Sequence, residues 1–129
     1  MVTTWNVVDS SGWIEYFLDT RRADIFAHAI EATAHLIVPA ISFYEVHRFL
    51  SRTVSPQEVE EALDVMRRGR VIELTDARAI AASKTAQAHQ LAMADAVMYA
   101  AAVEFSAQFW TQDVDYKGLP LVQYNVKIV

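Results

Sequence analysis

The sequence contains no cysteine among its 129 residues. This absence excludes disulfides, thiolate metal sites and a cysteine nucleophile, and it is compatible with a reducing cytoplasm. Glycine and proline are scarce, with three of each, while 53% of the residues are hydrophobic, which excludes a disordered or low-complexity chain. A chain of this length can bury one core, so we expect a single domain over residues 1–129.

Long apolar runs and excess basic charge are also missing. The longest apolar stretch, Leu91–Val103, is interrupted by Asp95, whereas a membrane-spanning helix needs about 20 apolar residues. The first residues carry no basic or apolar segment of the kind found in signal peptides. We therefore expect a cytoplasmic protein without membrane association. The net charge of −5 argues against a strongly basic nucleic-acid binder and leaves metal ions or cationic partners as candidates.

Apolar periodicity predicts alternating strands and helices. The β-type runs are Trp5–Val8, Leu36–Val38, Val71–Leu74, Phe109–Trp110 and Leu121–Tyr124. Helical spacing or capping signals occur over Trp13–Leu18, Ile25–Ile30, Ser42–Leu50, Ser55–Gly69, Thr75–Gln90 and Ala92–Ser106. This alternation predicts βαβ units, hence an α/β sandwich in which a parallel sheet has helices on both faces.

Acidic residues occur where such a sheet would present a ligand site. Asp9 and Asp113 follow predicted strands, Glu45 lies in the turn after the second strand, and Asp95 begins the apolar helix before the fourth. Open α/β sheets bind ligands beyond the carboxyl ends of their strands. In a parallel sheet, the four acids can therefore converge on one edge.

Three of these acids also have ordinary structural interpretations. Asp9 can cap the helix that follows it. Glu45 and Ser42 match the spacing of a capping box, and Asp113 can stabilise a turn. The sequence alone does not decide between these structural roles and a role in a ligand site.

Asp95 is harder to explain as a structural residue. It lies in a helix that is apolar on nearly every face, and no Lys or Arg occurs between Lys84 and Lys117. A buried, unpaired carboxylate is costly, so either a distant base, a cation or a place in the first helical turn must account for it.

Clustered carboxylates without nearby bases suit a hard divalent cation such as Mg²⁺ or Mn²⁺. A cation of this kind can activate water and stabilise charge on a phosphoryl group. Crowded carboxylates also repel one another, so at least one of them should have a raised pKa in the metal-free fold.

Four acidic motifs occur in order along the chain: Val7–Ser11, Phe43–Val46, Met93–Ala96 and Trp110–Asp113. Together they resemble the motifs of PIN-domain ribonucleases, in particular the toxins of VapBC-type toxin–antitoxin pairs. The resemblance implies a three-layer α/β sandwich with a five-stranded parallel sheet, and a Mg²⁺- or Mn²⁺-dependent endoribonuclease. It implies that the catalytic and metal-binding acids are Asp9, Glu45, Asp95 and Asp113. The supporting residues are then Ser10, Thr111 and, as an auxiliary acid, Asp115.

The resemblance also implies partners. These are an RNA substrate, a cognate antitoxin whose tail obstructs the acidic pocket, and a second copy of the chain, so that homodimers and toxin–antitoxin hetero-oligomers are expected. The apolar residues Trp13, Phe17, Phe49 and Leu50 are candidates for the dimer contact.

The alternative is a non-catalytic, Mg²⁺-binding α/β switch or binding module similar to a receiver domain. Such a domain needs a lysine after a late strand, and Lys117 is the only late lysine before Lys127. A metal-dependent phosphatase is a second possibility, but Asp9-Ser10-Ser11 lacks the second Asp of the haloacid-dehalogenase-type nucleophile motif.

The remaining polar residues carry weaker signals. The four histidines match no metal or triad spacing, so we expect them to be exposed or half-buried: His28, His35, His47 and His89. The arginine clusters are expected to form solvated faces: Arg21–Arg22, Arg48 with Arg52, and Arg67–Arg70. RNA backbone contacts would have to come from some of these arginines, because the acidic pocket itself repels phosphate.

Overall fold

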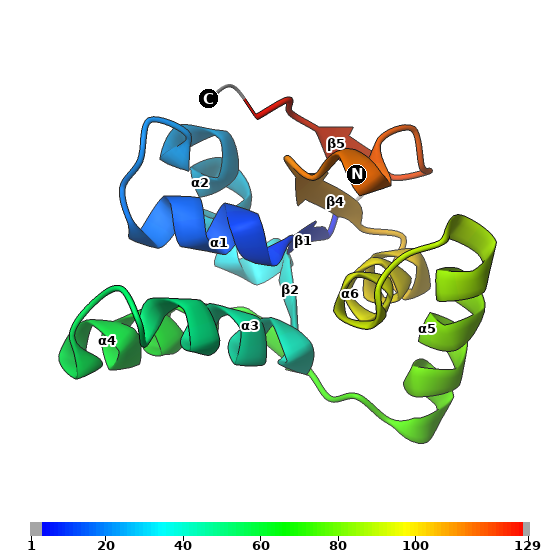
Figure 1. Ribbon diagram of the computed structural model, residues 1–129, viewed down its shortest axis with the longest axis horizontal. Coiled ribbons are helices and arrows are strands. Elements are labelled where there is room, and N and C mark those ends of the chain that lie inside the picture. Colours follow the sequence, from blue (N-terminus) through cyan, green and yellow to red (C-terminus); the bar gives the residue numbers. More distant parts are fainter. Residues whose placement is uncertain (1–3, 128–129) are drawn as a thin grey trace.

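The computed structural model describes residues 4–127, in which five parallel strands lie between two groups of helices (Figure 1). The strands are β1 (Asn6–Val8), β2 (Leu36–Pro39), β3 (Arg70–Ile72), β4 (Gln108–Thr111) and β5 (Val122–Tyr124). The α-helices are α1 (Ser10–Phe17), α2 (Ala23–Glu31), α3 (Ala40–Leu50), α4 (Pro56–Met66), α5 (Asp76–His89) and α6 (Met93–Glu104). Two short 3₁₀ helices are η1 (Thr33–His35) and η2 (Val114–Tyr116). The expected three-layer α/β sandwich is confirmed.

The order of the strands is β3-β2-β1-β4-β5, so β1 is central and pairs with both β2 and β4. The chain adds β2 and β3 on one side of β1, and then returns to add β4 and β5 on the other. The gap between the carboxyl ends of β1 and β4 is therefore the point at which the winding reverses. In open α/β sheets, ligands bind at such a point.

Alternate residues of the strands pack into two separate cores. Val7, Ile37 and Phe109 share one core with α5 and α6, where Tyr99 packs edge-on against Phe109. Val8 and its neighbours on the opposite face pack against α1 to α4. Figure 1 shows these two groups of helices on opposite sides of the sheet. The period-2 alternation of a strand accounts for this division, because successive side chains point to opposite faces.

Two of the residues considered for a dimer contact belong to these cores. Trp13 is fully buried and Leu50 is 1% exposed, so neither side chain is available to a partner. Trp13 stacks on Phe17 instead, and only Phe49 of the four is exposed. The expectation was wrong for Trp13 and Leu50, because sequence alone does not distinguish apolar core residues from apolar surface residues.

The beginnings of the helices test the capping signals. Ser55 forms the expected capping box with Glu58 at the start of α4, and Thr75 caps α5. The capping box assigned to Ser42 and Glu45 is wrong, because α3 begins at Ala40, directly after β2, and has no side-chain cap. Ser42 is therefore the third helical residue, and Glu45 has no capping role.

The segment around β3 also differs from the expectation. Helix α4 ends at Met66, not at Gly69, and β3 covers Arg70–Ile72, one residue earlier than the expected start and two short of the expected end at Leu74. Gly69 lies against β2, where an added Cβ would come within 2.9 Å of the Val38 side chain. Close packing, and not the end of a helix, thus explains why glycine occurs at this position.

None of the helices within residues 4–127 has the length and hydropathy to cross a bilayer.

Gly12 provides a test of the packing between α1 and the sheet. Replacing an interior helical glycine by alanine ordinarily stabilises a helix, but a Cβ at this position would lie 2.6 Å from the Phe26 ring and 2.7 Å from Val8. We expect Gly12→Ala to lower the free energy of unfolding by about 1–3 kcal/mol, because both neighbours are buried. Denaturant melts measure this change. Ser83→Ala, at an exposed position of α5, is the control and should be neutral or stabilising; an equal gain for Gly12→Ala would contradict the packing argument.

Candidate metal centre

The predicted acids lie at the carboxyl edge of the sheet, around the ends of β1 and β4. Asp9 directly follows β1, and its backbone N–H donates to the Trp110 carbonyl at 2.9 Å. Asp113 lies two residues beyond the end of β4. Helices α3 and α6 carry Glu45 and Asp95 in or near their first turns. Because helices of an α/β sandwich run back against the strands, these first turns also lie at this edge.

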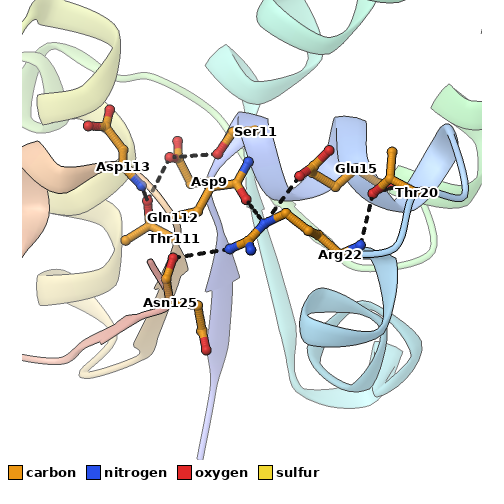
Figure 2. A network of polar contacts seen from close by, with 9 residues as sticks. All are labelled: Asp9, Ser11, Glu15, Thr20, Arg22, Thr111, Gln112, Asp113 and Asn125. Carbon is orange, nitrogen blue, oxygen red and sulfur yellow. Dashed lines mark hydrogen bonds and ion pairs between the residues drawn. The ribbon is translucent and has the colours of Figure 1, made fainter. Parts of the chain in front are cut away.

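Asp9 combines the capping role with a place in the cluster. Its Oδ1 accepts from the Ser10 backbone N–H at 2.8 Å, which caps α1. Its Oδ2 accepts from the Thr111 hydroxyl at 2.9 Å and from the Ser11 hydroxyl at 3.3 Å (Figure 2). Thr111 Oγ1 in turn accepts from the Asp113 backbone N–H at 2.9 Å. One hydroxyl therefore connects the acid after β1 with the acid after β4.

Burial makes the negative charge of Asp9 costly. The residue is 4% exposed, and its pKa is raised to about 7, with burial as the largest of several causes. The nearby charges of Asp95 and Asp113 also contribute to this rise in pKa, while the hydrogen bonds from Thr111 and Ser10 oppose it. Repulsion among the acids therefore contributes as expected, but loss of solvation is the larger cause.

Three carboxylates form a compact group on the loop side of the site. Asp95, Asp113 and Asp115 each offer an oxygen within 4.8 Å of the others. Asp113 Oδ1 also accepts from the Asp115 N–H at 2.9 Å, so the turn role of Asp113 and its place in the cluster coexist. Sequence reasoning gave Asp115 only an auxiliary place, yet it offers a carboxylate oxygen within 4.8 Å of those of Asp95 and Asp113.

Asp95 is half-buried at the third position of α6, in the first helical turn as the sequence alternative anticipated. Within residues 4–127, none of the ion pairs involves Asp95. Burial raises its pKa, and the charges of Asp113, Glu45 and Asp115 add to the rise. A distant arginine therefore does not account for this buried acid.

Ser10 connects Glu45 to the other acids. Its hydroxyl donates to Glu45 Oε1 and also contacts the Met98 sulfur at 3.4 Å. Ser10 is buried, and Glu45 is close enough to influence the pKa of Asp95. Asp9 and Glu45 are not members of the compact group formed by Asp95, Asp113 and Asp115, but their charges act on it, and the hydroxyls of Thr111 and Ser10 hold them in place.

Tyr116 is a residue that the sequence reasoning missed. It is fully buried, and its hydroxyl makes no hydrogen bond of regular geometry, although it interacts with Asp95 and offsets part of the rise in that carboxyl's pKa. Burial, followed by the charges of Asp9 and Asp95, raises the pKa of Tyr116 far above its usual value. The available signal was its spacing, three residues after Asp113, but a lone aromatic residue is more often part of the core.

Arg22 contradicts the expectation of a solvated basic face. Its side chain is 15% exposed, Nε donates to Gln112 Oε1, and Nη2 donates to the Asn125 carbonyl at 3.2 Å. Nε also lies 3.4 Å from a Glu15 oxygen. As Figure 2 shows, Arg22 therefore ties α1 and the segment after β5 to the loop of Gln112, which lies between Thr111 and Asp113.

Other parts of the chain offer less chemistry. All four histidines are exposed, as expected. A cavity of about 640 Å³ lies between α5, α6 and the end of β3, but none of the acids of the candidate metal centre lines it. Lys117, the late lysine that a receiver-like switch would use, is exposed, and its Nζ lies 5.7 Å from the centre of the Tyr124 ring.

The donor set fits a hard divalent cation. It consists of carboxylate oxygens, it includes no basic partner for Asp95 within residues 4–127, and it lies beside a buried hydroxyl without a regular partner. Mg²⁺ and Mn²⁺ prefer such oxygen ligands. Their charge would also relieve the unfavourable burial of Asp9 and Asp95.

Comparisons with known proteins agree with this geometry. The family model of the PIN domain matches residues 7–120. A search of curated proteins gives no match. Among solved structures, the chain is similar to a toxin–antitoxin complex from Klebsiella pneumoniae, with 19% identity, a TM-score of 0.78, and coverage of 95% of this chain and 99% of that one.

Two further structures share the fold. One is VapBC2 from Rickettsia felis bound to a DNA fragment from its promoter, with 12% identity, a TM-score of 0.73, and coverage of 95% of this chain and 98% of that one. The other is VapC20 from Mycobacterium tuberculosis, a toxin that cleaves the sarcin–ricin loop, with 16% identity, a TM-score of 0.74, and coverage of 89% and 95%.

The raised pKa of Asp9 predicts a pH dependence of stability. Because the folded pKa of about 7 exceeds the value of 3.8 assigned to the free side chain, protonation of Asp9 stabilises the metal-free fold at low pH. This contribution is lost as the pH rises from about 4 to about 7. In EDTA, the wild-type melting temperature should fall across this window. Asp9→Asn, which stays neutral, should show a smaller fall; identical pH profiles would contradict the assignment.

The contacts of Arg22 predict that it is structural. Arg22→Met should lower the free energy of unfolding by about 2–4 kcal/mol, because it leaves Glu15 and Gln112 without their shared partner in a largely buried position. The neighbouring Arg21, which is exposed, is the matched control. Arg21→Met should change stability by no more than about 0.5 kcal/mol. Denaturant melts measure both; equal small losses would place Arg22 on a solvated face after all.

Proposed function

The chain belongs to the PIN-domain family, and we propose that it is a metal-dependent endoribonuclease that acts as the toxin of a toxin–antitoxin pair. The observation that supports this proposal is the compact group of Asp95, Asp113 and Asp115 at the sheet's winding reversal, with the charges of Asp9 and Glu45 acting on it and no basic partner for Asp95 within the described residues. Nuclease chemistry explains why so much uncompensated negative charge is held at one edge.

In this proposal, the four acids hold Mg²⁺ or Mn²⁺, and Asp115 contributes as an auxiliary acid. The bound cation supplies Lewis acidity, which activates water and offsets the charge that develops on the phosphoryl group. Thr111 and the Ser10 backbone N–H orient the two oxygens of Asp9, and the Ser10 hydroxyl directs Glu45 toward Asp95. These hydrogen bonds fix the carboxylates before the substrate arrives, which reduces the reorganisation that the reaction requires.

The reaction is hydrolysis of an RNA phosphodiester. Water attacks the phosphorus in line with the 3′-oxygen, the P–O3′ bond breaks, and the products carry a 5′-phosphate and a 3′-hydroxyl. The compact acidic group contains no histidine. The chain's own role is therefore to position negative charge and exclude solvent around Asp9 and Thr111, both of which are buried.

The proposed partner is an antitoxin that covers the acidic pocket. Support comes from the similar structures, one described as a toxin–antitoxin complex and another as VapBC2 bound to promoter DNA.

A homodimer also forms part of the proposal. Its apolar contacts would come from exposed side chains such as Leu74 and Val103, which line the 640 Å³ cavity, because Trp13 and Leu50 are buried.

The acids provide the direct test of this function. We expect Asp9→Asn, Glu45→Gln, Asp95→Asn and Asp113→Asn each to lower the rate of RNA cleavage by about a hundredfold or more, because each removes a charge that holds the cation. Asp115→Asn should lower it less. The measurement is cleavage of labelled RNA in Mg²⁺ or Mn²⁺, with the product ends identified. Full cleavage by the Asp95→Asn protein would remove the central residue of the proposal.

Thermal melts with and without Mn²⁺ are the control for this experiment. At 100 times its dissociation constant, a ligand of the folded state adds about 2.7 kcal/mol to wild-type stability. Asp95→Asn should remain folded and should gain less from the metal. An equal gain in both proteins shows that Asp95 is not a ligand, even if the variant is inactive.

A further inference from the structure

A second surface, on the helix that carries Glu45, has a different composition. A groove of about 590 Å³ lies between α3 and α4 and is lined by Phe43, Tyr44, His47, Arg48, Ser51, Arg52 and Leu63. The lining thus combines aromatic side chains with basic ones. It contains no acidic residue, although the chain as a whole has a net charge of −5.

The groove is adjacent in sequence to one of the proposed metal ligands. Tyr44 immediately precedes Glu45 in α3, and Tyr44, Arg48 and Arg52 follow at intervals of four residues. Residues at this spacing lie on one face of a helix, and the eight helical steps from Tyr44 to Arg52 would cover about 12 Å along its axis. Arg52 lies two residues beyond Leu50, the last residue of α3, so the row of side chains runs from the residue next to Glu45 to the end of the helix.

The basic side chains of this row are free to bind an anion. Among residues 4–127, the ion pairs involve Arg22, Arg67 and Arg78, so neither Arg48 nor Arg52 is paired. The acids closest to the groove in sequence are already engaged, because Glu45 accepts from Ser10, and Asp64, next to Leu63, pairs with Arg67 at 2.7 Å. Within residues 4–127, therefore, no ion pair neutralises Arg48 or Arg52.

The aromatic part of the groove is exposed to an unusual extent. Tyr44 is 62% exposed, and Phe43 is half-buried beside it. An exposed aromatic ring next to unpaired arginines is the combination that binds single-stranded nucleic acids, since bases stack on the ring and phosphates bind the cations. A paired base offers no free face for such stacking, so this composition favours an unpaired strand.

From these observations we infer that the α3–α4 groove binds the single-stranded segment of RNA next to the cleaved phosphodiester, with a base on Tyr44 and phosphates on Arg48 and Arg52. This inference rests on the proposed ribonuclease function and locates its substrate contacts. It also explains how an acidic protein binds a polyanion: attraction is confined to one groove, and the acidic pocket receives only the reacting phosphate.

The experiment measures RNA affinity in an Asp95→Asn background with Mg²⁺, so that binding is observed without cleavage. The probes are a fluorescein-labelled single-stranded RNA of random sequence, about 12 nucleotides long, and a duplex of similar length. Tyr44→Ala should weaken single-strand binding about tenfold and leave duplex binding unchanged, whereas Tyr44→Trp should retain single-strand binding. Retention by tryptophan distinguishes stacking from a general loss of structure.

Salt dependence tests the two arginines. Arg48→Gln and Arg52→Gln should each reduce the slope of log affinity against log salt by about 0.7, the value for one phosphate contact on a single strand. Arg67→Gln is the matched control, because Arg67 is exposed on the neighbouring turn but paired with Asp64. Its slope should equal that of the parent protein.

Other outcomes would overturn the inference in distinguishable ways. If the wild-type chain cleaves RNA but the Tyr44 and Arg48 variants bind it like the parent, the groove is wrong and the ribonuclease function stands. If these variants bind RNA normally but lose self-association in light scattering, the groove belongs to a second copy of the chain. If the wild-type chain neither binds nor cleaves RNA, the proposed function itself fails.

Discussion

The hydrogen bond from Thr111 to Asp9 is the contact on which the acidic site depends. It joins residues that are 102 positions apart in sequence but follow neighbouring strands, and the same hydroxyl accepts from the backbone of Asp113. Burial of this contact raises the pKa of Asp9 to about 7, so the fold holds the carboxylate in a state that is electrostatically unfavourable without a cation. The surrounding structure, including the largely buried Arg22 and its bond to Gln112, stabilises this loop against that cost.

Ordinary structural roles and functional roles coincide at this site. Asp9 caps α1, and Asp113 accepts from the Asp115 N–H in the turn that leads into η2. Each carboxylate has two oxygens and several lone pairs, so one hydrogen bond to the backbone leaves capacity for another partner. The capping and ligand interpretations of such residues are therefore not exclusive. Glu45 differs, because α3 begins before Ser42 and its carboxylate meets a hydroxyl from another element.

The arginines show how charge is distributed in an acidic chain. Arg22 is part of the internal scaffold, Arg67 and Arg78 pair with nearby acids, and Arg48 and Arg52 face a groove without such partners. Net charge alone consequently says little about RNA binding, because affinity depends on which cations are both exposed and unpaired. The segregation of acids at the sheet edge and bases along α3 is compatible with a single strand that approaches along the helix and reacts at the edge.

The sequence by itself determined the features that depend on neighbouring residues. Period-2 and period-3.6 patterns located the strands and helices, Ser55 and Thr75 identified two helix starts, and the charge of Asp95 within an apolar helix indicated a special site. Only the tertiary structure decided that β4 pairs with β1, that Arg22 bonds to Gln112, and that Tyr116 lies buried beside Asp95. The reason is physical: caps and periodicities act over a few residues, whereas the order of strands is set by the burial of both faces of the whole sheet.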